Sequence, residues 1–468
     1  MSIFESFAEL QSGQPLMVYE LNEVPWRVID WYVRRNTDSA LGQILGSAAT
    51  FTTVTHDEGE LHPWTTWPTF HRGVTNSKHN IRFINQTMKD AEEYPPLWET
   101  LKFAGKRVGL FGSLQSYPPP KTGGYEFYVP DTFAPGTETW PVKYEAFQRF
   151  NLHQTQRDSA QSKPVQFDSS RAGDLLGMFQ SGLRISTFLT LANHLIRERA
   201  NPLYRTRRSV MQAVVAFDMF QDALKHSRPD FSTFFTNHVA GMMHRYWKFT
   251  FPEDFAFEIK TTEDKFHAES IGFAMAIADA QIGALMRYVN SRGGRLLIAT
   301  SMGQEAIDRG AYLGEWRITN LPMLLNAIAW NSPIRNLLAM QPDFNFALTS
   351  ESDAERFLIS TARLTDAKGQ SIWKRAQRIG ATVNLGLAPS EFALKTGQVY
   401  LSTDGPEKLS MAIADLGIEY LKRDPGTGYH QPRGALVLYG NGIHSNNART
   451  EVDLTSVRPA ILQMMGVH

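Results

Sequence analysis

Histidine and threonine side chains beside short apolar segments are the groups of this sequence that could do chemistry. His238 lies in the apolar segment 231–239, His244 follows six residues later, and His430 precedes the last apolar segment. Imidazole nitrogens combined with carboxylate oxygens suit zinc or manganese. Such a cation would lower the pKa of a threonine hydroxyl and neutralise charge on a phosphoryl oxygen. These residue types are therefore compatible with metal-assisted phosphoryl transfer.

The threonine best placed for this chemistry is Thr66, in the segment 62–75, which is dense in threonine, proline and aromatic residues. Pro63 and Pro68 favour extended backbone at the residues before them, so we do not expect a helix interior here. Thr69 could then cap a helix that begins one residue later, where free backbone N–H groups would attract an anionic substrate. The alternative is a tryptophan-rich loop that packs on the core.

Polar residues at two further strand ends could join the same site. Glu20 and Asn22 close the apolar segment that begins at Pro15, and Ser301 closes the segment 295–301. If these strands are parallel neighbours, their carboxyl ends face one crevice, where open α/β sheets bind ligands. A histidine near a strand end is, however, more often a hydrogen-bonded structural residue than a ligand. The spacing alone leaves that alternative open.

The segments that carry these residues alternate between strands and helices. A helix over 97–104 stops at Gly105 and leads into a strand over 106–113, a succession typical of doubly wound folds. A long helix over 268–291 precedes the strand 295–301, and a helix over 454–465 ends the chain. We therefore predict an α/β fold with a mostly parallel, doubly wound sheet and two inserted cap regions.

The predicted core is discontinuous in sequence. Residues 117–225 form a mainly helical insertion, which carries the basic cluster Arg205-Thr206-Arg207-Arg208 on a face that we expect to be solvated. Residues 306–404 form a second insertion of mixed helices and short strands. The core then comprises residues 1–116, 226–305 and 405–468.

Composition indicates a folded globular protein in the cytoplasm. Of the 468 residues, 42% are hydrophobic and 20% charged, and 47 basic residues balance 47 acidic ones, so no global basic field would recruit nucleic acid or anionic lipid. The absence of cysteine excludes disulfides, thiolate metal sites and a cysteine nucleophile. The first nine residues lack the basic charge of a signal peptide. Residues 271–286 are interrupted by Asp279 and Gln281, which favours a buried helix over a membrane span.

The order of elements and three motifs resemble the alkaline phosphatase superfamily, in its type I phosphodiesterase/nucleotide pyrophosphatase branch. The family nucleophile lies in a Pro-x-x-Thr-x-Pro motif, which Pro63-Trp64-Thr65-Thr66-Trp67-Pro68 matches, so the resemblance places Thr66 at the nucleophile. The segment from Ala240 to His244 is similar to the family's Asp-x-x-x-His but lacks its Asp. His430 is similar to the family's last histidine ligand.

The resemblance also shows where this sequence departs from the family. Asn22 stands at the position of an Asp, and Ser301 and Met302 stand where the family has Asp and His. A thioether cannot replace an imidazole for a hard or borderline cation, so an intact two-metal site is not expected.

The resemblance implies one zinc or manganese ion held through His244 and His430, with His238 in place of the missing Asp. Asn22 completes the predicted ligand set together with a carboxylate from Glu20, Glu23 or Asp57. Among these three acids we favour Glu20, because alternation along a strand turns it to the same face as Asn22.

We therefore expect a phosphoester hydrolase, acting on a diester or monoester, or a phosphotransferase. It would act on a small phosphorylated molecule with Thr66 as nucleophile, and Thr69 and Ser301 would bind the substrate. The alternative is a non-catalytic family member whose crevice binds a ligand or partner. The sequence does not predict an oligomeric state.

Overall fold

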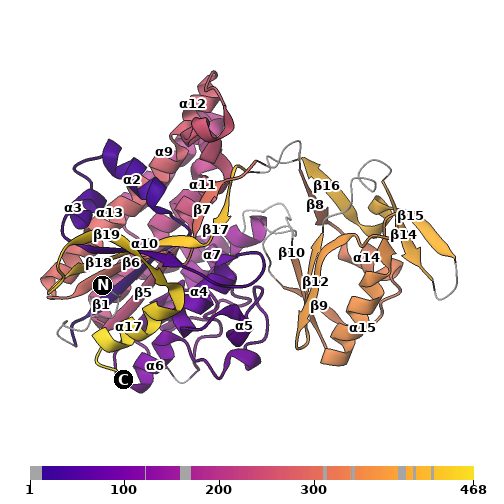
Figure 1. Ribbon diagram of the computed structural model, residues 1–468, viewed down its shortest axis with the longest axis horizontal. Helices are drawn as coiled ribbons and strands as arrows, with labels where there is room; N and C mark the ends of the chain where they lie inside the picture. Colours follow the sequence, from indigo (N-terminus) through magenta and orange to yellow (C-terminus); the bar gives the residue numbers. More distant parts are fainter. Residues whose placement is uncertain are drawn as a thin grey trace.

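The computed structural model describes most of the chain, namely residues 13–121, 123–158, 170–308, 314–337, 339, 343–387, 397–403, 407–422 and 426–467. It has a large lobe built around an eight-stranded sheet and a small lobe with its own sheets (Figure 1). The small lobe is formed by the chain between β7 and β17, within residues 314–422.

The central sheet is organised around β1 (Leu16–Leu21), whose residues are all buried. Its side chains alternate between the two faces of the sheet. Met17, Tyr19 and Leu21 enter one hydrophobic cluster, whereas Leu16 and Val18 enter another. The sheet is therefore covered on both faces, which explains why its strands are continuous apolar runs.

Seven of the eight strands run parallel. β1 lies between β5 (Phe231–Thr236) and β6 (Arg295–Ala299) and is parallel to both. Only β18 (Arg433–Gly440) is antiparallel to its neighbours. The strand order is β19-β2-β18-β6-β1-β5-β3-β4, with β2 at Ala49–Val54, β3 at Val108–Phe111, β4 at Phe127–Val129 and β19 at Asn446–Asp453. The predicted mostly parallel α/β sheet is confirmed.

Helices pack on both faces of this sheet, as a doubly wound fold requires. The face of Tyr19 is covered by α2 (Trp26–Arg35), α3 (Ala40–Leu45), α7 (Glu145–Asp158), α10 (Arg208–Ser227), α11 (His238–Thr250) and α13 (Ser270–Ser291). The face of Val18 is covered by α4 (Pro63–Arg72), α6 (Leu97–Phe103) and α17 (Val457–Met464). α8 (Ser170–Gln180) adds Met178 to the cluster on the Tyr19 face, and α9 (Ile185–Ala200) packs against this cluster through Leu191. The remaining helices are α5 (Asn76–His79) and α12 (Thr262–Ala268).

In the first predicted insertion, residues 117–225, the described part is mainly helical, and several of its elements share the main core. Strand β4 joins the edge of the central sheet beside β3. Phe147 of α7 and Phe220 of α10 belong to the same hydrophobic cluster as Tyr19. We therefore propose to count these elements with the core.

The small lobe has a separate hydrophobic cluster, which includes Phe346, Phe357 and Val383. The second insertion was predicted to end at residue 404, between β14 and β15, but these strands pair with each other. We propose a boundary near residue 422. The elements of this lobe are β8 (Gly314–Ile318), α14 (Leu321–Ala327), β9 (Ile334–Leu337), β10 (Asp343–Leu348), α15 (Glu351–Ala362), β11 (Leu364–Thr365), β12 (Trp373–Ile379), β13 (Thr382–Leu387), β14 (Gln398–Ser402), β15 (Lys408–Ala412) and β16 (Ile418–Lys422).

Polar contacts join the small lobe to the large one. The Asn345 amide donates to the backbone oxygen of Ile84 at 2.6 Å. The Glu60 carboxylate accepts from Arg375 at 2.7 Å and from Lys374 at 3.3 Å, both on β12. These bonds hold β12 beside the loop that leads into α4.

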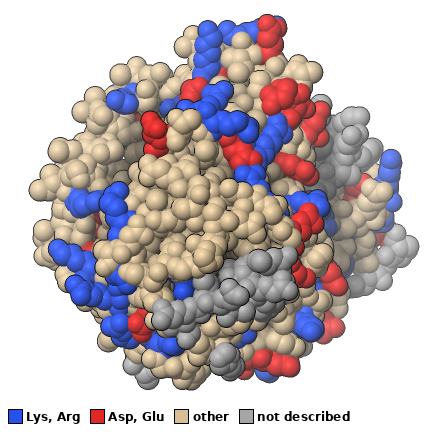
Figure 2. All heavy atoms as spheres, turned by 60° about the vertical axis from the view of Figure 1, so that its left-hand side comes forward, with Lys and Arg blue, Asp and Glu red and all other residues tan. Residues whose placement is uncertain are grey.

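Charge is spread over the surface. On the face shown in Figure 2, charged residues surround an uncharged area, with Lys and Arg more frequent on its left side and both signs mixed on its right. Among the described residues, no helix is long and apolar enough to cross a membrane.

Gly109 of β3 offers a test of this packing. A Cβ atom there would lie 2.2–2.8 Å from ring atoms of Phe127 on the neighbouring strand. We expect Gly109→Ala to lower the free energy of unfolding by about 1–3 kcal/mol through overpacking, measured by denaturant unfolding. The matched control is Gly241→Ala in α11, where a Cβ meets nothing within 4 Å. Since alanine favours helix, this control should not destabilise the protein, and equal losses in both variants would contradict the packing described.

Candidate metal centre

Three parallel strand ends bring polar residues together at one edge of the central sheet. β6, β1 and β5 are consecutive in the sheet, and Leu21 of β1 lies opposite Thr236 of β5. Their carboxyl ends lead into Ser301, Glu23 and Asn237, respectively. These strands are therefore the parallel neighbours on which the predicted crevice depends.

Glu23, His244 and His430 form a compact group at this edge. One ligand atom from each lies within 4.8 Å of the other two. The Nε2 atoms of His244 and His430 lie 3.0 Å and 3.4 Å from the same carboxylate oxygen, Glu23 Oε2. The Glu23 side chain is 2% exposed and His430 7%, whereas His244 is 33% exposed and opens the group to solvent. We call these three residues the EHH cluster.

Glu23 reaches the cluster because the chain turns sharply after β1. Its backbone has a φ of 63°, in the left-handed region that few residues other than glycine adopt. The Asn22 amide donates to Glu23 Oε1 at 2.8 Å, and the Gln304 amide donates to Glu23 Oε2. Both carboxylate oxygens are thus held in place by neutral donors.

The two histidines come from α11 and from the strand β17 (Gly428–Gln431). β17 pairs with β7 (Gly303–Ala306), which sets His430 opposite Gln304. A Cβ at Gly428 would lie 2.5 Å from the backbone oxygen of Met243, so glycine permits this close approach of β17 to α11. The backbone oxygen of Gly428 lies 2.9 Å from His244 Nδ1 and accepts its hydrogen. This bond leaves Nε2 of His244 directed at Glu23.

Within the EHH cluster, the histidines shift the pKa of Glu23, and Glu23 shifts the pKa of His430. Burial disfavours ionised Glu23, but His430 and His244 outweigh burial and hold the pKa of its carboxyl well below the usual range. For His430, burial alone would lower the pKa of the imidazolium, yet Glu23 raises it above the ordinary value. The Glu23 carboxylate therefore stays ionised, and positive charge beside it stabilises this buried ion.

The donor set fits a divalent cation. One carboxylate and two imidazoles are ligands of zinc or manganese, and three protein ligands leave a position open for substrate. The hydrogen bond from His244 Nδ1 to a carbonyl is the outer contact by which metal-binding histidines are oriented.

Two of the predicted metal ligands lie outside this cluster. The Glu20 carboxylate bonds to His71 Nε2 at 2.8 Å on the face of α4. The ring nitrogens of His238 lie 2.6 Å from Thr236 Oγ1 and 3.0 Å from the backbone oxygen of Ala274. His238 and His244 both lie on α11, where a spacing of six residues points them in different directions. We therefore do not carry Glu20 and His238 into the proposed ligand set.

Asn22, also a predicted ligand, is occupied by protein contacts. Its amide donates to Asn237 Oδ1 at 2.6 Å as well as to Glu23, and its oxygen accepts from the Trp67 indole at 2.8 Å. An Asp here would place a second buried charge beside Glu23, whereas the neutral amide bridges a carboxylate and an indole. We therefore assign Asn22 to the support of Glu23.

The segment around Thr66 differs from its predicted conformation. α4 begins at Pro63 and continues through Pro68, so the prediction of a helix beginning after Thr69 is wrong. Proline is well suited to the first helical position, because the N–H that it lacks would have no partner there. Pro68 leaves the Trp64 carbonyl without its helical donor, and the Gln115 amide approaches that oxygen at 3.4 Å.

Thr66 therefore lies one turn inside a helix. Its backbone N–H donates to the His62 carbonyl at 3.0 Å and is not free for an anion. Its hydroxyl lies 2.7 Å from the Ser301 hydroxyl, and both side chains are fully buried. Met302, next to Ser301, is also fully buried.

Thr69, predicted to bind substrate, belongs to a separate buried network. Its hydroxyl lies 2.7 Å and 2.8 Å from the two carboxylate oxygens of Asp57 and 3.0 Å from His79 Nε2. Burial raises the pKa of the Asp57 carboxyl despite these bonds. This network ties the loop before α4 to α5.

His62 is a candidate that sequence reasoning missed. It precedes α4, stacks on Trp64 with ring centroids 4.3 Å apart, and meets the His430 ring edge-on at 5.6 Å. Both of its ring nitrogens are buried without a hydrogen-bond partner. Burial, followed by the charges of His430 and Arg375, lowers its pKa to about 3, so the ring is neutral. Its position just before the Pro-x-x-Thr-x-Pro motif was the available signal.

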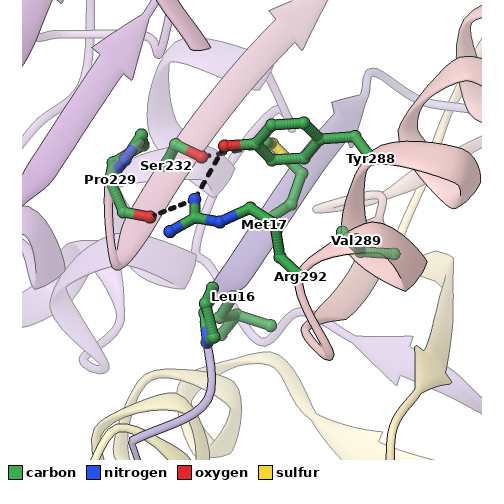
Figure 3. Close-up of a pocket in the computed structure, with 8 residues that line it drawn as sticks. Leu16, Met17, Pro229, Ser232, Tyr288, Val289 and Arg292 are labelled. Atoms are coloured by element: carbon green, nitrogen blue, oxygen red, sulfur yellow. Dashed lines mark hydrogen bonds between the residues drawn. The ribbon is translucent and has the colours of Figure 1, made fainter. Parts of the chain in front are cut away.

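A small pocket lies at the opposite edge of the sheet (Figure 3). It is lined by residues at the amino ends of β1 and β5, including Met17 and Ser232. The guanidinium of Arg292 donates to the Pro229 carbonyl at 2.8 Å and to the Tyr288 hydroxyl at 2.7 Å. The polar groups there bond to one another, so this pocket is not the candidate site.

Several solved structures are similar to this chain along most of its length. Phosphonoacetate hydrolase from Sinorhizobium meliloti 1021, in complex with phosphonoformate, is 11% identical, with 97% of this chain and 96% of that chain covered and a TM-score of 0.40. Murine ectonucleotide pyrophosphatase/phosphodiesterase 5 is 10% identical, with coverages of 97% and 96% and a TM-score of 0.40. Alkaline phosphatase from Thermus thermophilus is 13% identical, with coverages of 100% and 94% and a TM-score of 0.44.

No family model and no curated protein matches the sequence significantly.

Proposed function

We propose that this chain is a phosphoester hydrolase or phosphotransferase of the alkaline phosphatase superfamily, acting on a small phosphorylated molecule with one divalent cation in the EHH cluster. The observation that carries this proposal is the position of two imidazole Nε2 atoms against one buried oxygen of Glu23. Resemblance of the motifs supplies the reaction class, and the donor set supplies the cation.

The hydrogen bonding of His244 leaves Nε2 to carry either a second proton or a cation. Because Nδ1 of His244 donates to Gly428, a neutral ring has a lone pair on Nε2, facing the lone pairs of Glu23 Oε2. This contact is favourable only if His244 is protonated at both nitrogens or if a cation lies between the two atoms. A divalent cation would also satisfy His430, which approaches the same oxygen.

When bound, the cation would supply positive charge for a phosphoryl oxygen and for the attacking group. The residues of the chain then have separate tasks. His244 is the most exposed member of the cluster and lies on the side from which substrate would enter. Gln304 holds the Glu23 carboxylate, and the neutral His62 ring lies beside His430.

Thr66 is the proposed nucleophile, supported by its place in the Pro-x-x-Thr-x-Pro motif. Ser301 fixes the direction of the Thr66 hydroxyl through their 2.7 Å hydrogen bond. For attack, the hydroxyl would have to leave Ser301 and give up its proton, and a substrate would have to reach a residue that is fully buried.

This burial favours the second candidate function, a non-catalytic member that binds a ligand at the EHH cluster. Serine is no stronger a base than threonine, so the observed partner of Thr66 does not activate it. The Asn22–Trp67 bond and the buried Met302 occupy positions at which the family has metal ligands. The two candidate functions share the cation and differ in turnover.

The cation can be tested directly. We expect the parent protein to retain about one equivalent of zinc or manganese after dialysis, measured by elemental analysis. Glu23→Gln and His430→Ala should lose this metal, and Gln304→Ala should weaken its binding about 10- to 100-fold, because it releases the carboxylate. Glu20→Gln and His238→Gln are controls that remove candidate ligands outside the cluster. Sub-stoichiometric metal in the parent, or equal loss in the controls, would overturn the metal centre.

The nucleophile is tested by turnover of an activated aryl phosphodiester and monoester with zinc, manganese, iron or magnesium. We expect Thr66→Ala to reduce turnover to the level of Glu23→Gln while changing the melting temperature little, and Thr66→Ser to retain part of it because the hydroxyl remains. Turnover that survives in Thr66→Ala but not in Glu23→Gln would reject Thr66 as nucleophile. A metal-loaded parent without turnover would favour the non-catalytic function.

A further inference from the structure

Helix α9 presents its apolar side to solvent. Ile185 is 71% exposed, Leu189 60% and Ile196 67%. Such positions, three or four residues apart, form one stripe on a helix, and in a globular protein that stripe normally faces the core. We name as the α9 stripe the residues Ile185, Phe188, Leu189, Leu195 and Ile196, all of which are exposed.

The inward side of α9 is mainly polar, with partly buried Leu191 packed against the main hydrophobic cluster, and its contacts fix the orientation of the helix. The buried residues of α9 are Thr187, His194 and Glu198. Glu198 accepts from Arg208 at 2.9 Å and lies 3.3 Å from His194. If α9 turned its apolar stripe inward, the partly buried ion pair of Glu198 with Arg208 would break, and no new ion pair would replace it. The outward stripe is therefore a property of the fold.

Positive charge surrounds the α9 stripe. Residues 183–208 contain six arginines and no lysine, and Glu198 is their only acidic residue. Arg208 is paired with Glu198, Arg184 is paired with Asp218, and Arg207 is buried. The exposed positive charge of this segment is therefore that of Arg197, Arg199 and Arg205. Arg197 and Arg199, in the last turn of α9, are exposed.

The combination of an apolar stripe with arginine defines the chemistry of its partner, and we propose that α9 docks on an anionic lipid surface. Apolar side chains enter the boundary between headgroups and acyl chains, and guanidinium groups bind lipid phosphates. The chain as a whole has no net charge, so the attraction is local.

A second copy of the chain is a less suitable partner. In a two-fold symmetric dimer the same surface lies on both sides of the interface. Arginines of the 183–208 segment would then face the same segment of the other copy, where Glu198 is already paired and buried. An anionic surface supplies the charge that a second copy lacks.

This proposal does not depend on the EHH cluster and is tested by cosedimentation of the full chain with vesicles. We use phosphatidylcholine alone and phosphatidylcholine mixed with phosphatidylglycerol. Binding should require the anionic lipid and decrease as salt is raised. Leu189→Ser combined with Ile196→Ser should lower the partition coefficient about tenfold or more, because two exposed apolar groups are removed.

Two further variants separate the contribution of arginine charge from that of exposed apolar side chains in general. Arg197→Gln combined with Arg199→Gln should reduce the preference for anionic vesicles. Ile359→Ser is the matched control, since Ile359 is 62% exposed on α15, in the small lobe, and its loss should leave binding unchanged. Absence of binding to anionic vesicles, or equal binding by the Leu189→Ser/Ile196→Ser variant, would overturn the proposal. So would light scattering that shows a dimer which this double variant dissociates.

Discussion

The candidate site depends on one buried negative charge. Glu23 is 2% exposed, yet its neighbours keep it ionised, and the groups around it can be understood as the means of making that charge tolerable. Two imidazoles approach one of its oxygens, and neutral amides from Asn22 and Gln304 donate to the carboxylate. Each of these groups comes from a different part of the chain. The carboxylate therefore links β1, α11, β7 and β17 as well as serving as a ligand.

Beside Glu23, the same edge of the sheet carries polar contacts between neutral groups. A site built from carboxylates would carry excess negative charge if its metal were absent. Here Asn22 bonds to the Trp67 indole, Ser301 bonds to Thr66, and Met302 is buried. Each contact is between neutral groups and needs no metal. Negative charge remains at Glu23, where the histidines are.

Sequence reasoning succeeded where a pattern is local and failed where a contact is distant. The continuous apolar runs and glycine stops located β1, β6 and α13 to within a few residues. In contrast, α4 contains Pro68, and the packing of Trp67 overrides the local preference for extended backbone before it. Three acids were considered as the carboxylate ligand, and the alternation of side chains along a strand favoured Glu20. This alternation does not extend to Glu23, because β1 ends at Leu21. The left-handed turn at Glu23 brings its side chain to the cluster and is not visible in residue types.

The location of the small lobe has a consequence for how the site is assembled. β7 and β17 form a two-stranded ribbon, and the whole small lobe is inserted between them, so Gln304 faces His430 across a long excursion of the chain. A flexible connection as long as the one between β7 and β17 would lose much entropy when these strands pair. A folded lobe whose first and last residues lie close together largely removes this penalty. The small lobe thus acts as a preorganised connector that delivers His430 to Glu23. Gln304 and His430 both belong to the large lobe, so a folded small lobe lowers the cost of completing the centre without supplying a ligand itself.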